Sequence, residues 1–240
     1  MKLIAIVTDL HLGDDFPRAN NVDAAKRWNI IFEDIKKRNV NQIVINGDIG
    51  DRPSNFVFFN ELKYAGIPFT LTLGNHDFYD EAIKYFYRNN PNNDLELYYA
   101  EEDEETLFIY LDSLTGTISK NQYDWLATQL RSPKKIFIFI HHPILPVPTI
   151  VDTLYPLTNR EEIVNLLFQH TGPITICCGH YHIEHDQTVG NVRQLVTPAA
   201  SVQIQQDDKE VIIDTTKFGY RLLLLRNNVI QTDVIWFEND

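Results

Sequence analysis

The amino-acid sequence predicts an α/β fold whose strands are covered by helices on both faces. Short runs rich in Ile, Val, Leu and Phe recur along the chain, and helical patterns separate several of them. The runs are LIAIVTD (3–9), QIVINGD (42–48), FTLTLGN (69–75), TLFIYLD (106–112), KIFIFIHH (135–142) and ITICCGH (174–180). Strands that are apolar throughout are typical of sheets buried on both faces. Their alternation with helices indicates an α/β protein.

The helices are predicted from apolar spacing and from capping patterns. Four apolar residues fall on one face of the first helix: Ala24, Trp28, Ile31 and Ile35. Ser119 and Gln122 have the spacing of a capping box that opens the second helix. Thr158 and Glu161 have the same spacing and open the third, which Gly172 and Pro173 should end.

The C-terminal part reads as strands without helices, at RQLVTP (193–198), YRLLLL (220–225) and VIQTDVIWF (229–237). We expect these strands to complete the sheets of the same domain. No linker or low-complexity tract divides the chain, so residues 1–240 are predicted to form one domain. The acidic run 101–105 is predicted to be a solvated turn.

Composition limits the classes of partner. The chain has 240 residues, 44% of them hydrophobic, and a net charge of −12, which disfavours a nucleic-acid polymer as partner. The only cysteines, Cys177 and Cys178, are adjacent and form no disulfide framework. The apolar start is too short for a signal peptide, and no run is long enough to cross a membrane. A cytoplasmic protein is therefore expected.

Metal-binding residue types gather where the predicted strands end. They are Asp9 and His11, then Asp48, then Asn75, His76 and Asp77, then His141 and His142, and finally His180 and His182. Ligands collect at the carboxyl ends of strands in open α/β sheets. Gly47, Gly74 and Gly179 precede three of these groups and allow close backbone approach. Each motif alone is common, but together they indicate a metal site.

The order DLH, GD, GNHD, HHP and GHYH resembles the calcineurin-like metallophosphoesterase superfamily over residues 9–182. The tail, TPAASVQ (197–203) and FGYRLLLL (218–225), resembles the end of the class III bacterial cyclic-nucleotide phosphodiesterases. This resemblance implies a four-layer α/β/β/α sandwich of two mixed sheets flanked by helices. It also implies a centre of two metal ions.

The implied ligands are Asp9, His11 and His182 for one metal, Asn75, His141 and His180 for the other, and Asp48 as the bridge. Imidazole, carboxylate and amide ligands suit Mn, Fe, Zn or Co, and the set contains no thiolate. A water shared by two cations would lose a proton near neutral pH and attack phosphorus in line. The resemblance implies that His76 contacts the phosphate or protonates the leaving oxygen.

Other polar residues are assigned supporting roles. Asp77 is counted with His76 as a catalytic residue, because it could accept a hydrogen bond from His76 or from a metal-binding histidine. His142 fits a supporting role and simple packing equally well. Asp51 is expected to cap a helix or support a loop, whereas Asp112 is expected to be structural. His170 and His185 have no motif around them and are expected at the surface or in turns.

Two segments bear on the substrate. In the class III branch hydroxyl residues often precede the glutamine of the tail, where this chain has Ala199 and Ala200. Any substrate contact made through those hydroxyls is absent, whereas Gln203 remains. The tyrosines of segment 79–99 could stack on a base, but half-buried packing is the preferred interpretation.

The leading hypothesis is a phosphodiesterase that acts on a small phosphodiester, with 3′,5′-cyclic nucleotides as first candidates. A phosphomonoesterase, or a hydrolase of nucleotide-linked or lipid-linked phosphate, would use the same metals. A non-catalytic scaffold on this fold is the alternative from a different class. The expected partner is a small phosphate ester, without nucleic-acid polymer or membrane. Pairing of exposed tail strands between two chains would give a homodimer.

Overall fold

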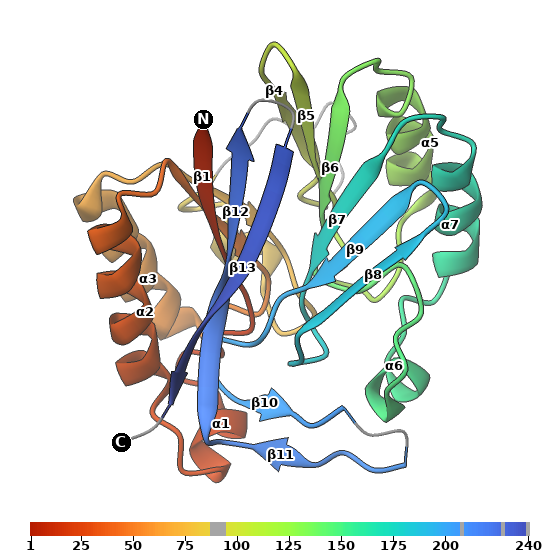
Figure 1. Ribbon diagram of the computed structural model, residues 1–240. Coiled ribbons are helices and arrows are strands. Elements are labelled where there is room, and N and C mark those ends of the chain that lie inside the picture. Colours follow the sequence, from red (N-terminus) through yellow and green to blue (C-terminus); the bar gives the residue numbers. More distant parts are fainter. Residues whose placement is uncertain (87–94, 207–208, 227–228, 239–240) are drawn as a thin grey trace.

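The computed structural model describes residues 1–86, 95–206, 209–226 and 229–238. In this part of the chain two large sheets lie face to face, and helices cover the outer face of each sheet (Figure 1). The arrangement confirms the predicted four-layer α/β/β/α fold with two mixed sheets.

The first sheet has the strand order β13–β12–β1–β2–β3. Its strands are β1 (Lys2–Val7), β2 (Gln42–Asn46), β3 (Phe69–Thr72), β12 (Lys217–Arg226) and β13 (Val229–Glu238). β1, β2 and β3 are parallel, whereas β12 runs antiparallel to β1 and β13 antiparallel to β12. The carboxyl ends of the three parallel strands therefore meet at one edge.

The second sheet has the order β4–β5–β6–β7–β9–β8. Its strands are β4 (Tyr99–Glu102), β5 (Thr106–Tyr110), β6 (Lys135–Phe139), β7 (Ile174–Cys178), β8 (His185–Val189) and β9 (Val192–Val196). β5, β6, β7 and β9 are parallel, and the two outer strands are antiparallel to their neighbours. As in the first sheet, four carboxyl ends share one edge.

Side-chain alternation along the strands builds two cores. Phe137 and Phe139 of β6 belong to the core between the sheets, whereas Ile136 and Ile138 belong to the core under the helices. α2 (Ala24–Arg38) and α3 (Arg52–Ala65) pack on the first sheet, and α5 (Lys120–Gln129) and α7 (Arg160–Phe168) on the second (Figure 1). The apolar runs are buried on both faces, as the sequence predicts.

The capping predictions have different outcomes. Ser119 accepts from the backbone N–H of Gln122, so the predicted start of α5 is confirmed. The predicted start of α7 is wrong. Asn159, not Thr158, occupies the N-cap position, and the Thr158 hydroxyl donates to the carbonyl of Gly116 at 3.0 Å. A long-range partner therefore outcompetes the local capping pattern.

The tyrosine-rich segment serves packing. Tyr99 stacks on Tyr110 with ring centroids 4.5 Å apart, and Tyr85 stacks on Phe59 with centroids 4.9 Å apart. Tyr87 lies outside the described residues. The acidic run 101–105, expected to be a turn, instead begins within the edge strand β4. An edge strand with one solvated face accommodates acidic residues, which the sequence pattern alone does not reveal.

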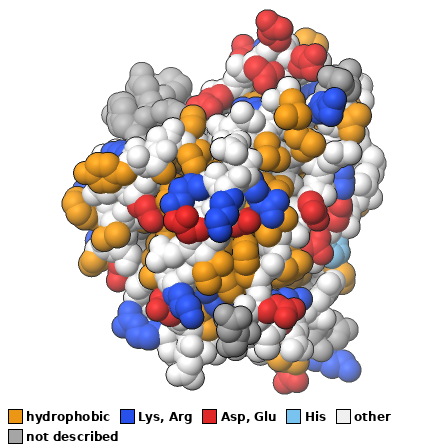
Figure 2. Space-filling model, turned by 60° about the vertical axis from the view of Figure 1, so that its left-hand side comes forward, with side chains coloured by type: hydrophobic (Ala, Val, Ile, Leu, Met, Phe, Trp, Pro, Cys, Tyr) orange, Lys and Arg blue, Asp and Glu red, His pale blue; other side chains and the backbone are white. Residues whose placement is uncertain are grey.

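Several short elements lie beyond the carboxyl ends of the parallel strands. They include α1 (Asp15–Ala19), α6 (Ile150–Leu154), β10 (Gln203–Ile204) and β11 (Ile213–Asp214), and α4 (Tyr79–Ala82) follows β3 in the chain (Figure 1). On the face seen in Figure 2, Lys and Arg side chains gather beside Asp and Glu side chains. Within the described ranges no helix has both the length and the apolarity needed to traverse a bilayer.

Candidate metal centre

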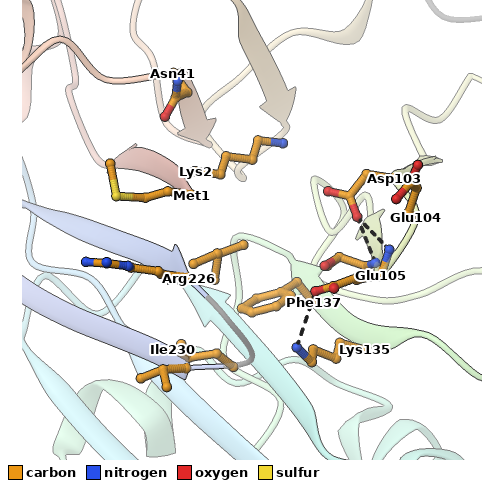
Figure 3. A pocket seen from close by; sticks show the side chains of 13 residues that line it. Met1, Lys2, Asn41, Asp103, Glu104, Glu105, Lys135, Phe137, Arg226 and Ile230 are labelled. Atoms are coloured by element: carbon orange, nitrogen blue, oxygen red, sulfur yellow. Dashed lines mark hydrogen bonds and ion pairs between the residues drawn. The ribbon is translucent and has the colours of Figure 1, made fainter.

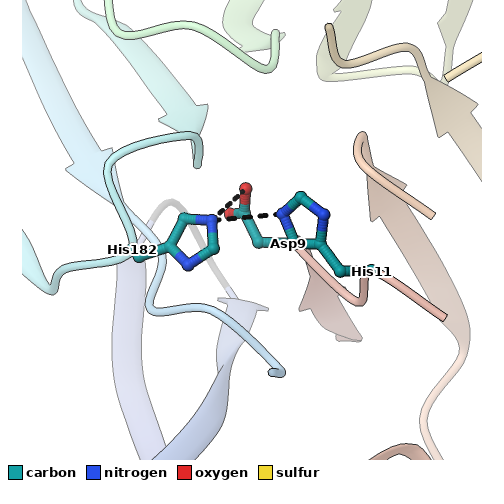
Figure 4. A group of neighbouring side chains, drawn as sticks. All are labelled: Asp9, His11 and His182. Carbon is teal, nitrogen blue, oxygen red and sulfur yellow. Dashed lines mark hydrogen bonds and ion pairs between the residues drawn. The ribbon is translucent and has the colours of Figure 1, made fainter. Parts of the chain in front are cut away.

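The predicted ligands come together where the carboxyl ends of the two sheets meet. Three groups of described residues have ligand atoms within 4.8 Å of one another, and one of them combines His11 with Asp14 and His76. The other two are clusters of predicted ligands: Asp9, His11 and His182, and Asp48, His141 and His180. Figure 4 shows the first cluster, with the three side chains pointing toward one another. Six of the seven predicted ligands thus lie in two neighbouring clusters.

Asp48 lies against both clusters. Its Oδ2 atom is 3.2 Å from Nε2 of His141 and 3.6 Å from Nε2 of His11. Across the site, His141 Nε2 is also 3.7 Å from Asp9 Oδ1. One carboxylate oxygen shared between the ligands of both clusters is the arrangement that a bridging ligand needs.

Asn75, the seventh predicted ligand, is exposed in the turn after β3. Its neighbours in the chain are held against Asp48. The backbone N–H of His76 donates to Asp48 Oδ1 at 2.9 Å, and the Cα of Gly74 lies against the same carboxylate. The turn that carries Asn75 therefore lies against Asp48, and Asn75 stays a predicted ligand.

Each histidine of the clusters has one ring nitrogen engaged and the other available. Nδ1 of His11 bonds to the Asp14 carboxylate at 2.9 Å. Nδ1 of His141 bonds to the Asn46 carbonyl at 2.9 Å, and Nδ1 of His182 to the Val202 carbonyl at 2.7 Å. His180 uses Nε2, 3.0 Å from the Tyr155 carbonyl. Such partners fix the ring and the tautomer of metal-binding histidines.

Two buried polar atoms at the centre of the site form no well-oriented hydrogen bond: Asp9 Oδ1, 3.3 Å from His182 Nε2, and His141 Nε2, 3.2 Å from Asp48 Oδ2. The other oxygen of Asp9 accepts from the Thr8 hydroxyl at 2.9 Å and from the His180 N–H at 3.1 Å. Buried polar atoms left unpaired are costly, about 1–3 kcal/mol each, and they call for a specific explanation. Oxygen and imidazole donors converging on one point fit a divalent cation.

The backbone at the ligands is strained. Among the described residues, seven that are not glycine have positive φ, and five of them are cluster residues. The five are Asp9 (53°), His11 (49°), Asp48 (54°), His180 (70°) and His182 (54°). Left-handed φ values are unfavourable for residues with a side chain, and such strain concentrates at functional sites.

The glycines of the motifs make this convergence sterically feasible. A Cβ at Gly74 would lie 2.2 Å from Asp48 Oδ1, and a Cβ at Gly47 would lie 2.5 Å from Nδ1 of His141. The sequence-based expectation that these glycines allow close approach is confirmed. At Gly74 the close contact with Asp48 is what requires a glycine. At Gly47 a φ of +91° also favours glycine.

The electrostatics of the site pair buried carboxylates with histidines. Burial raises the pKa of Asp9 and of Asp48, but the neighbouring histidines outweigh it and hold both pKa values below the ordinary range. Burial lowers the pKa of His141, but Asp48 and Asp9 outweigh it and raise that pKa to about 10. Without a metal, these carboxylates therefore draw a proton onto His141, and a cation would take the place of that proton.

Asp77 supports the backbone instead of a histidine ring. Its buried carboxylate accepts from the N–H groups of Asp48 and Ile49, both at 2.8 Å, and of Gly74 at 2.9 Å. Burial, followed by the charge of Asp48, raises its pKa to about 7. Asp77 thus joins the loops after β2 and β3. The prediction that it accepts a hydrogen bond from a histidine is wrong.

The two remaining histidines of the motifs differ in exposure. The exposed ring of His76 lies 4.9 Å from the ring of His11, at 78° to it. The ring of His142 is buried, 4.0 Å from the ring of His180, and its Nδ1 is 2.9 Å from the Ser113 hydroxyl. His142 therefore braces a ligand, whereas His76 is open to an incoming molecule.

Sequence reasoning missed Asn46, which joins the two sheets at the site. Its side chain donates to the carbonyls of Ile140 at 3.0 Å and Cys177 at 3.2 Å, across the interface between the sheets. Its carbonyl accepts from the Thr8 hydroxyl at 3.0 Å, in addition to the contact with His141. A polar residue at the end of the otherwise apolar run QIVIN was the available signal.

Sequence reasoning also missed the support of Asp9 from the C-terminal segment. Ser201 donates to the Asp9 carbonyl through its hydroxyl, at 2.6 Å, and through its N–H, at 3.1 Å. The buried guanidinium of Arg27 donates to the Ser201 carbonyl. Ala199 and Ala200 are fully buried, so side chains at these positions face the interior and not a substrate.

Asp51 and Asp112 occupy the structural positions expected of them, whereas His185, expected at the surface or in a turn, lies in a strand. Asp51 is the N-cap of α3 and accepts from the N–H of Ser54 at 2.8 Å. Asp112 is buried and accepts from the N–H groups of Leu97 and Leu114. His170 bonds through Nδ1 to the carbonyl of Leu130, in a half-buried position. His185 begins the edge strand β8.

A cavity of about 550 Å³ lies far from this site, at the opposite ends of the strands (Figure 3). It is lined by residues at the start of β1 and β6 and at the end of β12, including Lys2, Lys135 and Arg226. Lys135 is 3.9 Å from Glu105, and Lys2 lies over the ring of Phe108. The cavity therefore shares no residue with the metal clusters.

Comparison with known proteins gives a consistent picture. Residues 2–184 match the family described as calcineurin-like phosphoesterase. The chain is 25% identical over 241 residues, 98% of its length and 94% of the relative's, to a probable cyclic nucleotide phosphodiesterase of Fibrobacter succinogenes. It is 26% identical to the 3′,5′-cyclic adenosine monophosphate phosphodiesterase CpdA of Haemophilus influenzae, covering 98% of this chain and 89% of the relative.

A third relative is the probable glycerophosphodiester phosphodiesterase GpdQ of Arcobacter nitrofigilis, 28% identical with 85% of this chain and 81% of the relative covered. Among solved structures, a dimetal phosphatase from Danio rerio has a TM-score of 0.70 at 13% identity, with 99% and 98% of the two chains covered. GAP50, described as an anchor in the inner membrane complex of Plasmodium, has a TM-score of 0.64 at 17% identity, with 98% and 84% covered. The fold is therefore shared by proteins with different described roles.

Proposed function

The chain belongs to the calcineurin-like phosphoesterase family, and we propose that it hydrolyses a small phosphodiester at a pair of metal ions, with 3′,5′-cyclic nucleotides as the first candidates. The family and its relatives make the chain a metal-dependent phosphoesterase. The proposal of a two-metal phosphodiesterase rests on the set of possible metal ligands. Four oriented histidines and two buried carboxylates form two clusters, and Asp48 of the second cluster also lies 3.6 Å from His11 of the first.

The residues that would hold the metals are Asp9, His11 and His182 in one cluster and His141, His180 and Asn75 in the other, with Asp48 between them. When bound, two such cations supply charge that stabilises the phosphoryl oxygens and promotes deprotonation of water. The protein orients these donors through the Asn46, Asp14, Val202 and Tyr155 contacts of the rings.

His76 is positioned to act on the substrate. It is exposed beside His11, and its N–H bond to Asp48 fixes the turn that carries it. An imidazole can donate a proton to a leaving oxygen near neutral pH. We assign this role to His76 and assign to Asp77 the support of the Asp48 loop.

Hydrolysis by the Mn-reconstituted protein tests the proposal. The substrates are 3′,5′-cyclic AMP and the activated diester bis(p-nitrophenyl) phosphate. Asp48→Asn should abolish hydrolysis of both and lower the metal content measured by elemental analysis. Asp51→Asn is the matched control. It lies in the same loop, and asparagine caps a helix as well as aspartate does, so activity should persist.

The substrate panel separates the alternatives. A glycerophosphodiester is included because the GpdQ relative is named for that class, and p-nitrophenyl phosphate represents monoesters. Preferential cleavage of the monoester would replace the diesterase proposal by a phosphomonoesterase. A protein that binds metal but cleaves none of these esters would refute the proposed function.

A further inference from the structure

A second cavity, of about 410 Å³, begins at His182 and extends between the β10–β11 hairpin and the ends of β12 and β13. It is attached directly to the metal site. The N–H of Ile204 donates to the His182 carbonyl at 2.9 Å, and His182 Nδ1 is 2.7 Å from the Val202 carbonyl. Gln203, which lies between Val202 and Ile204 in the chain, lines the cavity.

Gln203 lines this cavity and carries an unused hydrogen-bond acceptor. The side chain is 3% exposed, and its Nε2 donates to the Ala199 carbonyl at 2.7 Å, which fixes the orientation of the amide. Its Oε1 is buried and has no hydrogen-bond partner. A buried amide oxygen without a partner is unfavourable unless a ligand brings an N–H or O–H donor to it.

Lys217 and Trp236 line the same cavity. The Lys217 ammonium lies 4.5 Å from the centroid of the Trp236 ring, which is 37% exposed. Lys217 acts electrostatically on the Asp214 carboxylate of the same cavity, but no ion pair joins it to a carboxylate of the described residues. An aromatic ring with an ammonium donor beside it is suited to a planar, polar ligand.

The two carboxylates of the cavity already have partners. Glu184 is 3.3 Å from the buried Arg221 guanidinium, and Asp214 accepts from the N–H of Thr216 at 2.8 Å. The groups left to bind a ligand are therefore one acceptor, Gln203 Oε1, one donor, Lys217 Nζ, and the Trp236 ring. This set is complementary to the edge of a nucleobase, where an amino or ring N–H stands next to an acceptor nitrogen or oxygen.

We propose that this cavity is a nucleobase subsite. Gln203 Oε1 accepts from an N–H of the base, Lys217 donates to the adjacent ring nitrogen or carbonyl, and Trp236 flanks the ring. The inference rests on the proposed function, because the phosphate must lie at the metal clusters for the base to reach past His182. It adds a means of selecting the nucleobase, which the metal clusters themselves do not provide.

Calorimetric binding to the Mn-reconstituted protein tests the subsite. The probes are adenosine 5′-monophosphate and ribose 5-phosphate, which differ only in the base, with free phosphate assayed afterwards to confirm that both probes stay intact. The parent protein should bind the adenine nucleotide at least about 5-fold more tightly, because stacking of the base on an aromatic ring adds to its affinity. Trp236→Leu and Lys217→Met should each reduce this ratio toward one.

Matched controls guard against unfolding and charge effects. Lys37→Met removes the same charge from the exposed face of α2 and should keep the parent ratio. Gln203→Met removes the free acceptor with a side chain of similar length, and its melting temperature shows whether the fold survives. The ratio for this variant should also fall.

The outcomes separate the two proposals. Equal affinities for both probes in the parent, or a ratio that the cavity variants leave unchanged, would overturn the subsite whatever the enzyme hydrolyses. Base-selective binding lost in these variants, without cleavage of any diester, would support the subsite and reject the proposed phosphodiesterase.

Discussion

Gly74→Ala tests whether backbone contact sets the position of the shared carboxylate. A methyl group at residue 74 would lie 2.2 Å from Asp48 Oδ1, 2.7 Å from Asp48 N and 2.8 Å from its Cγ. Since Cβ contacts under 3.0 Å essentially never occur, the carboxylate and the turn must separate by about 0.8 Å. Gly74 has no positive φ, so an added methyl acts through this contact and not through backbone strain.

A displacement of about 1 Å at a catalytic centre typically costs about 100-fold in rate. We expect kcat/KM of Gly74→Ala for bis(p-nitrophenyl) phosphate to fall by that order, together with loss of bound metal by elemental analysis. Gly66→Ala is the control, because it should change stability and not activity. It has open space around its Cβ but a φ of +68°, so it should lose about 1 kcal/mol of stability and keep its activity.

A Gly74→Ala protein that binds as much metal as the parent and retains at least half of the parent kcat/KM would refute this reasoning. In that case the Asp48 carboxylate would not depend on the close approach of the turn.

Three further predictions concern the site and the core. Asp14→Asn should weaken metal binding about 10–100-fold, because the ring of His11 loses the carboxylate that orients it. Asp15→Asn changes an exposed neighbour and should leave metal binding unchanged. Competition with a chelator measures the metal affinity of both variants. The pKa of His141 is raised to about 10, so this ring is protonated below that pH and metal must displace the proton. Affinity should therefore rise with pH between about 6 and 9, and calorimetry in buffers of different ionisation enthalpy should show proton release; affinity independent of pH would contradict this. Both cysteines are fully buried, and burial raises their pKa values, so a thiol reagent at pH 7 should label neither until the protein is denatured; labelling of the native protein would disprove this.

The sequence predicts the fold and the residue types of the site well because both depend on local patterns. The apolar runs form strands of the two sheets, and the polar groups after β1, β2, β3, β6 and β7 lie at one edge. What the sequence does not reveal depends on partners far along the chain. Asn159 replaces Thr158 at the start of α7 because its side chain binds the backbone of Ile118, 41 residues away.

The same reason explains the misassignment of Asp77. Its position within GNHD suggests a histidine partner, yet its three hydrogen bonds go to backbone N–H groups, two of them from the loop after β2. Such a role becomes visible only when β2 and β3 are placed side by side. The cavity beside His182 likewise combines residues from 182 to 236, and no single motif contains them.

The metal centre depends on the junction of the two sheets more than on any one motif. Asp9 and Asp48 come from the first sheet, whereas His141, His180 and His182 follow strands of the second. Two independent contacts hold this junction, the Asn46 side chain on the carbonyls of Ile140 and Cys177, and Ser201 on the carbonyl of Asp9. Any sliding of one sheet over the other would break these bonds and separate the ligands of each cluster. The rigidity of the sandwich is therefore what keeps strained, charged ligands in place before a metal arrives, and this preorganisation is what a hydrolytic metal centre requires.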